Sequence, residues 1–196
     1  LEETNEPYAI AKIAGLKLCS ALASQHKFNV ISLMPTNLYG PGDNYNQYTS
    51  HVLPAFINRF HAAKIKGDKK VKCWGSGNPQ REFLHVDDLA NASIFLLENY
   101  SSNINSSPEN KMPELFNVGT GKDIKIKDLA NLIAKKIDYK GEIIWDPSKP
   151  DGTPRKLLDV SRLKNLGWAP SISLKKGIED TIKTYITESK MGRIRN

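Results

Sequence analysis

Tyr8 and Lys12 are the first residues of the chain whose types and spacing can do chemistry together. They are four positions apart, so a helix places both side chains on one face, one turn apart. An ammonium group beside a phenol favours the phenolate and lowers the pKa of the tyrosine. Such a tyrosine can donate a proton to a carbonyl that is being reduced, or take one from an alcohol. The alternative is an ordinary pair on a solvated helix face, because this spacing is short and common.

A second group of residues has the chemistry to bind or protonate an anionic substrate. His51 opens an expected helix and titrates in the range needed to move protons beside a ketone. Arg59 follows eight residues later, about two helical turns, so the two can share a face. The arginine fork suits pyrophosphate, which makes Arg81 a candidate anchor together with Lys156. Trp74 could stack on a base or sugar, although surface charges and a core tryptophan are the commoner fates of these residue types.

A third group, His85, Asp87 and Asp88, has side chains that metal ions bind. No further ligand lies at suitable spacing, so we expect a strand to end at the histidine and an aspartate to cap the next helix. The sequence therefore predicts no metal site.

Alternating helices and strands must position these residues. Apolar residues recur at helical spacing over 8–26, and residues 28–34 are expected to form a buried strand that ends at Pro35, before a Gly/Pro loop. The later pattern predicts helices over 50–66, 87–99, 123–138, 159–166 and 173–187, and strands over 70–74, 81–86, 115–118 and 142–145. Residues 43–49 and 101–113 are predicted loops, and 151–154 a turn. This alternation favours an α/β fold.

The composition is that of an ordinary globular protein and argues against several classes. Of 196 residues, 39% are hydrophobic and 25% charged, and no apolar run reaches the length of a membrane span. The polar start shows no signal peptide, and two cysteines, Cys19 and Cys73, fit core positions in a reducing compartment. We therefore expect a cytoplasmic protein. The net charge of +7 comes from scattered lysines, which favours an anionic small substrate over nucleic acid.

The order of the first motifs resembles the extended short-chain dehydrogenase/reductase superfamily. There, a helix with Y-x-x-x-K precedes a strand that ends in P-T-N-L-Y-G-P-G, as in this chain. The resemblance implies that Tyr8 is the catalytic acid/base and that Lys12 is its partner and orients the nicotinamide ribose. It also implies that the cofactor is lined by Pro35, Thr36, Asn37 and Leu38.

Further motifs narrow the resemblance to the GDP-L-fucose synthase family, whose members use NADPH to epimerise and reduce GDP-4-keto-6-deoxy-mannose. In chain order these motifs are T-S-H-V-L-P-A-F at 49–56, W-G-S-G-x-P-x-R-E-F-L-H-V-D-D-L-A at 74–90, F-N-V-G-T-G at 116–121 and K-P-D-G-T-P-R-K-L-L-D-V-S-R-L at 149–163. R-E-F-L-H-V-D-D alone marks nucleotide-sugar enzymes in general, whereas the combination is more specific. The resemblance implies NADP(H) as cofactor, a GDP-sugar as substrate and a homodimer.

The same resemblance assigns roles to single residues. His51 would be the acid of the epimerisation steps and would also contact the cofactor. Arg81 would bind pyrophosphate, and Asp151 would bind the nucleotide portion, with a plain turn residue as its alternative. The family's base is a cysteine that precedes the Y-x-x-x-K helix, and neither Cys19 nor Cys73 matches its position.

We expect the C-terminal part of a Rossmann-like doubly wound sheet plus a small α/β substrate-binding domain. Residues 1–48 would belong to the NADP-binding Rossmann domain and 49–196 mainly to the substrate-binding domain. Whether segments 81–100 and 114–121 return to the Rossmann domain is left open. None of the thirteen glycines forms the Gly-rich strand–turn–helix that opens a dinucleotide-binding fold, so we expect the second part of a larger protein.

Two alternatives to this function stay open. The first is another nucleotide-sugar epimerase or dehydratase of the same superfamily, against which the S-H-V-L-P segment argues. The second is a catalytically inactive fragment that only binds a nucleotide sugar or partner chains. In that case the apolar faces of helix 8–26 could pack against a second subunit.

Overall fold

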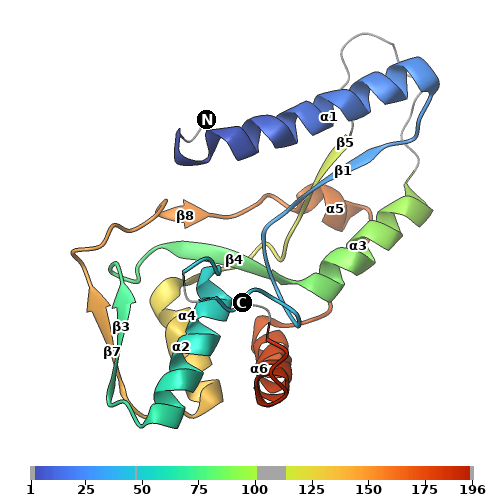
Figure 1. The fold of residues 1–196 in the computed structure, drawn as a ribbon. Helices are drawn as coiled ribbons and strands as arrows, with labels where there is room; N and C mark the ends of the chain where they lie inside the picture. Colours follow the sequence, from blue (N-terminus) through green and yellow to red (C-terminus); the bar gives the residue numbers. More distant parts are fainter. Residues whose placement is uncertain (1–2, 47, 101–113, 195–196) are drawn as a thin grey trace.

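Helices and strands alternate along the chain, as Figure 1 shows for the computed structural model, which describes residues 3–46, 48–100 and 114–194. The loop expected at 101–113 lies outside the described residues. The α/β class is confirmed. In chain order the elements are η1 (Glu3–Asn5), α1 (Glu6–His26), β1 (Ile31–Pro35), β2 (Asn37–Tyr39), α2 (Val52–Lys66), β3 (Lys70–Trp74), β4 (Gln80–His85), α3 (Val86–Asn99), β5 (Glu114–Val118), β6 (Asp123–Lys125), α4 (Ile126–Ile137), β7 (Glu142–Asp146), β8 (Arg155–Lys156), α5 (Ser161–Asn165) and α6 (Leu174–Lys190).

Several expected boundaries are wrong, and each has a local reason. α1 begins at Glu6 rather than at residue 8, because Pro7 fits the first turn of a helix. Lys27 then adopts a left-handed conformation with φ 54°, so the next strand starts at residue 31 and not at 28. His85, not an aspartate, caps α3, and its Nδ1 accepts a hydrogen bond from the backbone N–H of Asp87 at 3.3 Å. Local capping chemistry therefore sets these boundaries.

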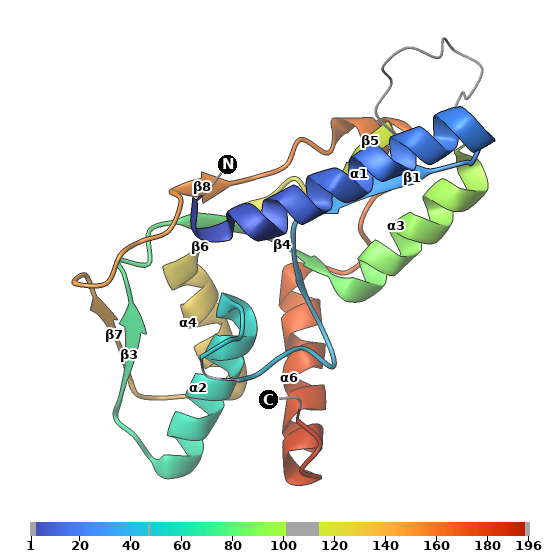
Figure 2. The same ribbon diagram turned by 45° about the horizontal axis from the view of Figure 1, so that its top comes forward.

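β1 and β5 form a two-stranded parallel sheet in which Pro35 stands opposite Val118. Phe116 and Val118 are fully buried in a small apolar cluster, to which α3 adds Leu96 and α5 adds Leu163. α1 runs alongside this sheet in both views (Figures 1 and 2), yet none of its residues is buried. The helix that carries Tyr8 thus lies on the outside of the described structure.

β4 is the central strand of a second sheet. Its last residues pair in parallel with β2, and its first residues pair with β6 antiparallel and with β8 in parallel. Phe83 packs into the larger apolar core and its neighbour Leu84 into the smaller one, so β4 joins the two. α3 packs against both β1 and β4. The division into domains near residue 48 stays a prediction.

The larger core lies between α2, α4, α6 and the parallel pair β3–β7 (Figure 2). Each helix buries a stripe of apolar residues at helical spacing, such as Phe56, Ile57 and Phe60 on α2. The ring of Phe60 stacks on Tyr139 with 5.7 Å between centres. This packing fixes β3, whose last residue is Trp74, and the neighbouring strand β4, which carries Arg81.

Candidate functional site

Tyr8 and Lys12 lie together on one face of α1. The ammonium Nζ of Lys12 is 5.4 Å from the centre of the Tyr8 ring. The tyrosine is 60% exposed, so its hydroxyl is open to a ligand. The structure therefore brings together the two groups that the spacing predicts for proton transfer to a carbonyl.

The predicted cofactor residues Pro35–Leu38 lie at the carboxyl end of β1, beside the end of β5. Ligands of open parallel sheets bind at this end of the strands. The side chains of Thr36 and Asn37 both donate to the backbone carbonyl of Glu82, at 3.2 and 2.8 Å. These two side chains fix the shape of the loop, while Pro35 stays exposed. α1 runs antiparallel beside β1 in Figures 1 and 2, so its end with Tyr8 points toward this loop and the residues present fit a nicotinamide cofactor.

His51 is the exposed residue just before α2, and its side chain makes no capping hydrogen bond. Arg59 lies two turns further on, where its Nη1 donates to the backbone carbonyl of Lys72 at 3.0 Å. A hollow of about 400 Å³ lies between α2 and β3, and its lining includes Arg59, Trp74 and Tyr48 but not His51. The spacing of His51 and Arg59 in the sequence does not show that only Arg59 lines the hollow.

Arg81 and Lys156 stand opposite each other in the parallel pairing of β4 with β8. The guanidinium Nη1 of Arg81 donates to the backbone carbonyl of Thr153 at 2.6 Å and to that of Gln80 at 2.7 Å. Partial burial lowers the pKa of Arg81, which nevertheless stays charged. Two of the predicted substrate anchors are thus neighbours in the sheet, and Arg81 also holds the chain that leads into β8.

Asp151 accepts hydrogen bonds from the backbone N–H and the hydroxyl of Ser76, at 2.8 and 2.6 Å. These bonds hold the pKa of Asp151 below its usual range. Gly75 is required here, because its φ is +77° and a Cβ would overlap the Asp151 carboxylate. The aspartate therefore ties the segment before β8 to the turn after β3. It also brings that segment to Trp74, which is 70% exposed and has the Nζ of Lys149 5.9 Å from its ring centre.

His85, Asp87 and Asp88, whose side chains could bind a metal ion, have structural partners within the protein. His85 caps α3, and Asp88 accepts hydrogen bonds from the N–H and hydroxyl of Ser171 and from the N–H of Ile172. Across the described ranges no group of three histidine, cysteine or acidic residues is placed to hold a metal. Nor does any helix in those ranges have the length and apolar character to cross a membrane.

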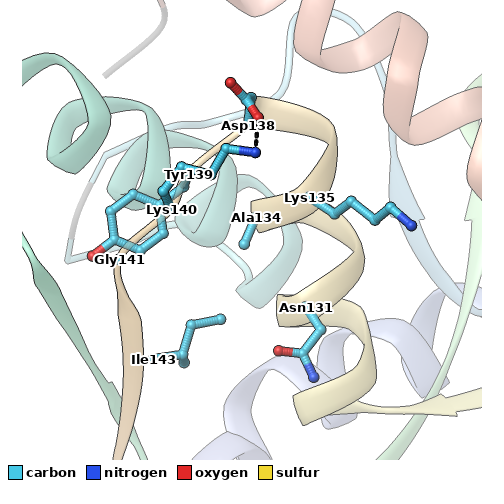
Figure 3. A pocket seen from close by; sticks show the side chains of 8 residues that line it. All are labelled: Asn131, Ala134, Lys135, Asp138, Tyr139, Lys140, Gly141 and Ile143. Atoms are coloured by element: carbon cyan, nitrogen blue, oxygen red, sulfur yellow. Dashed lines mark ion pairs between the residues drawn. The ribbon is translucent and has the colours of Figure 1, made fainter.

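Another hollow, of about 580 Å³, lies between α4 and β7 and holds none of the predicted site residues (Figure 3). Lys140 and Asp138 form an ion pair at its edge (Figure 3).

The buried Glu82 next to Arg81 is the residue that sequence reasoning missed, since a charge within a strand pattern resembles a surface position. Its position directly after Arg81 in R-E-F is the only signal the sequence offers.

The chain is similar to several known proteins. Residues 1–119 match the model of the NAD dependent epimerase/dehydratase family. The chain is 52% identical over 186 residues to probable GDP-L-fucose synthase 1 of Oryza sativa subsp. japonica, covering 95% of this chain and 54% of that protein. It is 53% identical over 188 residues to GDP-L-fucose synthase of Escherichia coli (strain K12), covering 95% and 58%. The chain thus spans little more than half the length of these curated relatives.

A solved structure resembles the fold at similar coverage. It is a GDP-mannoheptose C4 reductase from Campylobacter jejuni with NADP bound, 31% identical, with a TM-score of 0.78. The alignment covers 95% of this chain and 61% of that one.

Proposed function

Because this chain belongs to the NAD dependent epimerase/dehydratase family, we propose that it carries the catalytic tyrosine and the substrate-binding residues of a GDP-L-fucose synthase. That enzyme converts GDP-4-keto-6-deoxy-D-mannose to GDP-L-fucose by 3,5-epimerisation and NADPH-dependent 4-reduction. Two relatives that bear this name, each at 52–53% identity, support the proposal. The substrate and the reaction are thus proposed for a chain that spans part of the relatives' length.

The observation that carries the proposal is the register of β8 on β4, which puts Lys156 opposite Arg81. A pair of cations, one with a planar fork, suits the pyrophosphate of a nucleotide sugar. Asp151 fixes the segment that leads to this pair against the turn after β3, where the exposed Trp74 offers a flat apolar surface. Arg59 lines the hollow beside Trp74 and would supply a further positive charge to an anionic ligand there.

The chemistry follows from three side chains. Tyr8 would protonate the C4 oxygen as the ketone is reduced, with the ammonium of Lys12 close to its ring. When bound, the reduced nicotinamide supplies the hydride for this step. His51, whose imidazole makes no capping bond, would give a proton to carbons beside the ketone. Burial raises the pKa of the Cys73 thiol, so this cysteine is a poor base for the opposite proton transfer.

The cofactor, assembly and location belong to the same proposal. A neighbour with NADP bound supports NADP(H) as the cofactor held by Lys12, His51 and the loop 35–38. The unburied α1, with apolar side chains exposed at Ile10 and Leu18, supports a homodimer. We place the reaction in the cytoplasm, because both cysteines are free, as is usual in a reducing compartment.

A second candidate is a chain that binds a GDP-sugar or partner chains without turnover. In the described part of the chain no residue of α1 is buried, so little packing holds the catalytic helix, which favours this candidate. It predicts affinity for GDP without oxidation of NADPH.

Oxidation of NADPH in the presence of GDP-4-keto-6-deoxy-D-mannose separates these candidates. We expect turnover that Tyr8→Phe and Lys12→Met abolish, because each removes half of the proton-donating pair. Lys17→Met, at another exposed lysine of α1, is the matched control and should keep the wild-type rate. Binding of GDP without any NADPH oxidation by the wild type would favour the second candidate.

A further inference from the structure

Glu82 is a carboxylate with no solvent exposure, in the middle of β4. Its Oε1 accepts hydrogen bonds from the backbone N–H groups of Thr120 and Gly121, at 2.6 and 2.7 Å. Its Oε2 accepts from the N–H of Leu158 at 3.1 Å. A buried charge is tolerated only when such donors surround it. One side chain thus ties the turn after β5 and the segment after β8 to the central strand.

The neighbouring turn is shaped around this carboxylate. A Cβ at Gly119 would overlap the Glu82 carboxylate, so only glycine allows the approach. On the other side, the backbone carbonyl of Glu82 accepts the hydrogen bonds of Thr36 and Asn37 from the predicted cofactor loop. The backbone carbonyl of Glu82 therefore contacts the predicted cofactor loop, and its carboxylate contacts the segment that directly follows β8.

β8 needs such an anchor because it is a strand of only two residues, Arg155 and Lys156. Before it, the chain is held by Arg81 on the carbonyl of Thr153 and by the N–H of Gln80 on the carbonyl of Pro154, at 2.6 and 2.8 Å. After it, the Leu158 N–H on Glu82 is a hydrogen bond to a fully buried group. Hydrogen bonds to charged groups are stronger than neutral ones, so this bond and the bond from Arg81 to Thr153 are the strong ones on either side of β8.

We propose that Glu82 is a positioning residue of the nucleotide-sugar site, whose carboxylate fixes β8 on β4 and so holds Lys156 beside Arg81. The inference rests on the function proposed above. The negative charge of Glu82 would repel an anion, but the residue would favour anion binding because it holds Lys156 in position.

The charge of Glu82 and its proposed positioning role predict opposite changes in GDP affinity, so the direction of the change tests the proposal. Glu82→Gln removes a negative charge from the strand that carries Arg81, so the change in net charge alone predicts tighter binding of GDP. The glutamine amide has one acceptor oxygen where the carboxylate has two, so at least one of the three backbone N–H groups loses its partner. If Glu82 positions β8, GDP binds about tenfold more weakly despite the favourable change in charge.

The experiment is isothermal titration of GDP into the wild type and three variants, with a thermal melt of each. Asp88→Asn is the matched control, because Asp88 is also a buried carboxylate with three hydrogen bonds to residues 171–172, on the far part of the fold before α6. It should lower the melting temperature as Glu82→Gln does and leave the affinity for GDP unchanged. Leu158→Pro deletes the N–H that Oε2 accepts and leaves the Glu82 carboxylate in place, and it should weaken GDP binding in the same direction as Glu82→Gln.

The outcomes separate this inference from the function on which it rests. A wild type that binds no GDP removes the proposed function and the role of Glu82 with it. A wild type that binds GDP, with Glu82→Gln binding equally well or more tightly, overturns the role of Glu82 alone. Should Glu82→Gln not fold, Leu158→Pro decides, and unchanged affinity in that variant overturns the inference.

Discussion

Lys156 stands opposite Arg81 in the parallel register of β8 on β4, so two positive charges share one edge of the central sheet. The Nη1 of Arg81 donates to the carbonyls of Gln80 and Thr153. Among the described residues, this leaves the rest of its fork for a ligand. Like charges side by side repel unless an anion lies between them. This pairing is the reason why we propose an anionic ligand such as a pyrophosphate at this position.

From this pair we expect the shape of the arginine to matter as well as its charge. Arg81→Lys keeps the charge but loses the planar fork, so affinity for GDP should fall about tenfold. Lys156→Met should weaken binding by a similar factor, and Lys164→Met on α5, an exposed lysine away from β8, should have no effect. The measurement is titration calorimetry with GDP. Equal weakening by Lys156→Met and Lys164→Met, with no effect of Arg81→Lys, would mean that only the overall charge attracts the nucleotide.

Two helix glycines should respond in opposite ways to alanine. A Cβ at Gly177 in α6 would overlap the hydroxyl of Tyr39 and lie 3.1 Å from His85 Cδ2, so Gly177→Ala should destabilise by about 1–3 kcal/mol. Gly15 in α1 has no atom within 4 Å of such a Cβ, so Gly15→Ala should stabilise by roughly 0.5–1 kcal/mol through helix propensity alone. Urea unfolding of both variants checks this. Stabilisation by Gly177→Ala would show that Tyr39 packs elsewhere in solution.

His51 should be needed for exchange at the sugar carbons and not for binding. His51→Gln removes the imidazole that is proposed as the acid, so incorporation of solvent deuterium at C3 and C5 should drop by about a hundredfold or more. Affinity for GDP should stay within about twofold, because His51 does not line the hollow that holds Arg59. His26→Gln, at the exposed end of α1, is the control and should exchange like the wild type. Mass spectrometry of the recovered sugar nucleotide gives the readout, and undiminished exchange in His51→Gln would assign the acid elsewhere.

At low pH the end of the β3–β7 pair should lose the stabilisation that the Asp146 carboxylate provides. Its carboxylate accepts from Lys72 Nζ at 2.8 Å and from the Ser148 hydroxyl at 2.6 Å, which lowers its pKa from 3.8 to about 2. A depressed folded-state pKa means that this stabilisation is full above pH 3.8 and is lost as the pH falls through about 2.

The urea midpoint of the wild type should therefore fall across that window, and Asp146→Asn should reduce the slope. Asp128→Asn, at an exposed carboxylate in the first turn of α4, should keep the wild-type slope. Identical slopes for the wild type and Asp146→Asn would show that the Lys72 pair adds nothing in solution.

The sequence predicts the long elements well and the short ones poorly. The apolar period locates α2, α4 and α6 to within three residues, because their buried stripes are continuous. β6 and β8 have three and two residues, too few for an alternation to show. They form because β4 offers a free edge, which is a tertiary effect. Cys19, expected in the core, is only half-buried because α1 buries none of its residues in the described structure.

The candidate site divides in the same way. Residue types and motif order predict Tyr8 with Lys12 as a pair, and the structure brings them together. The juxtaposition of Arg81 with Lys156 depends on β8 and is invisible in a linear pattern. So is the role of Glu82, whose three backbone donors come from residues 38 or more positions away.

The most direct test of the account is to identify the sugar nucleotide formed from GDP-4-keto-6-deoxy-D-mannose and NADPH by nuclear magnetic resonance. We predict GDP-L-fucose, with C3 and C5 inverted and C4 reduced, and no such product from Tyr8→Phe. A product reduced at C4 without inversion at C3 and C5 would contradict the assignment and place the chain with another nucleotide-sugar reductase of its family.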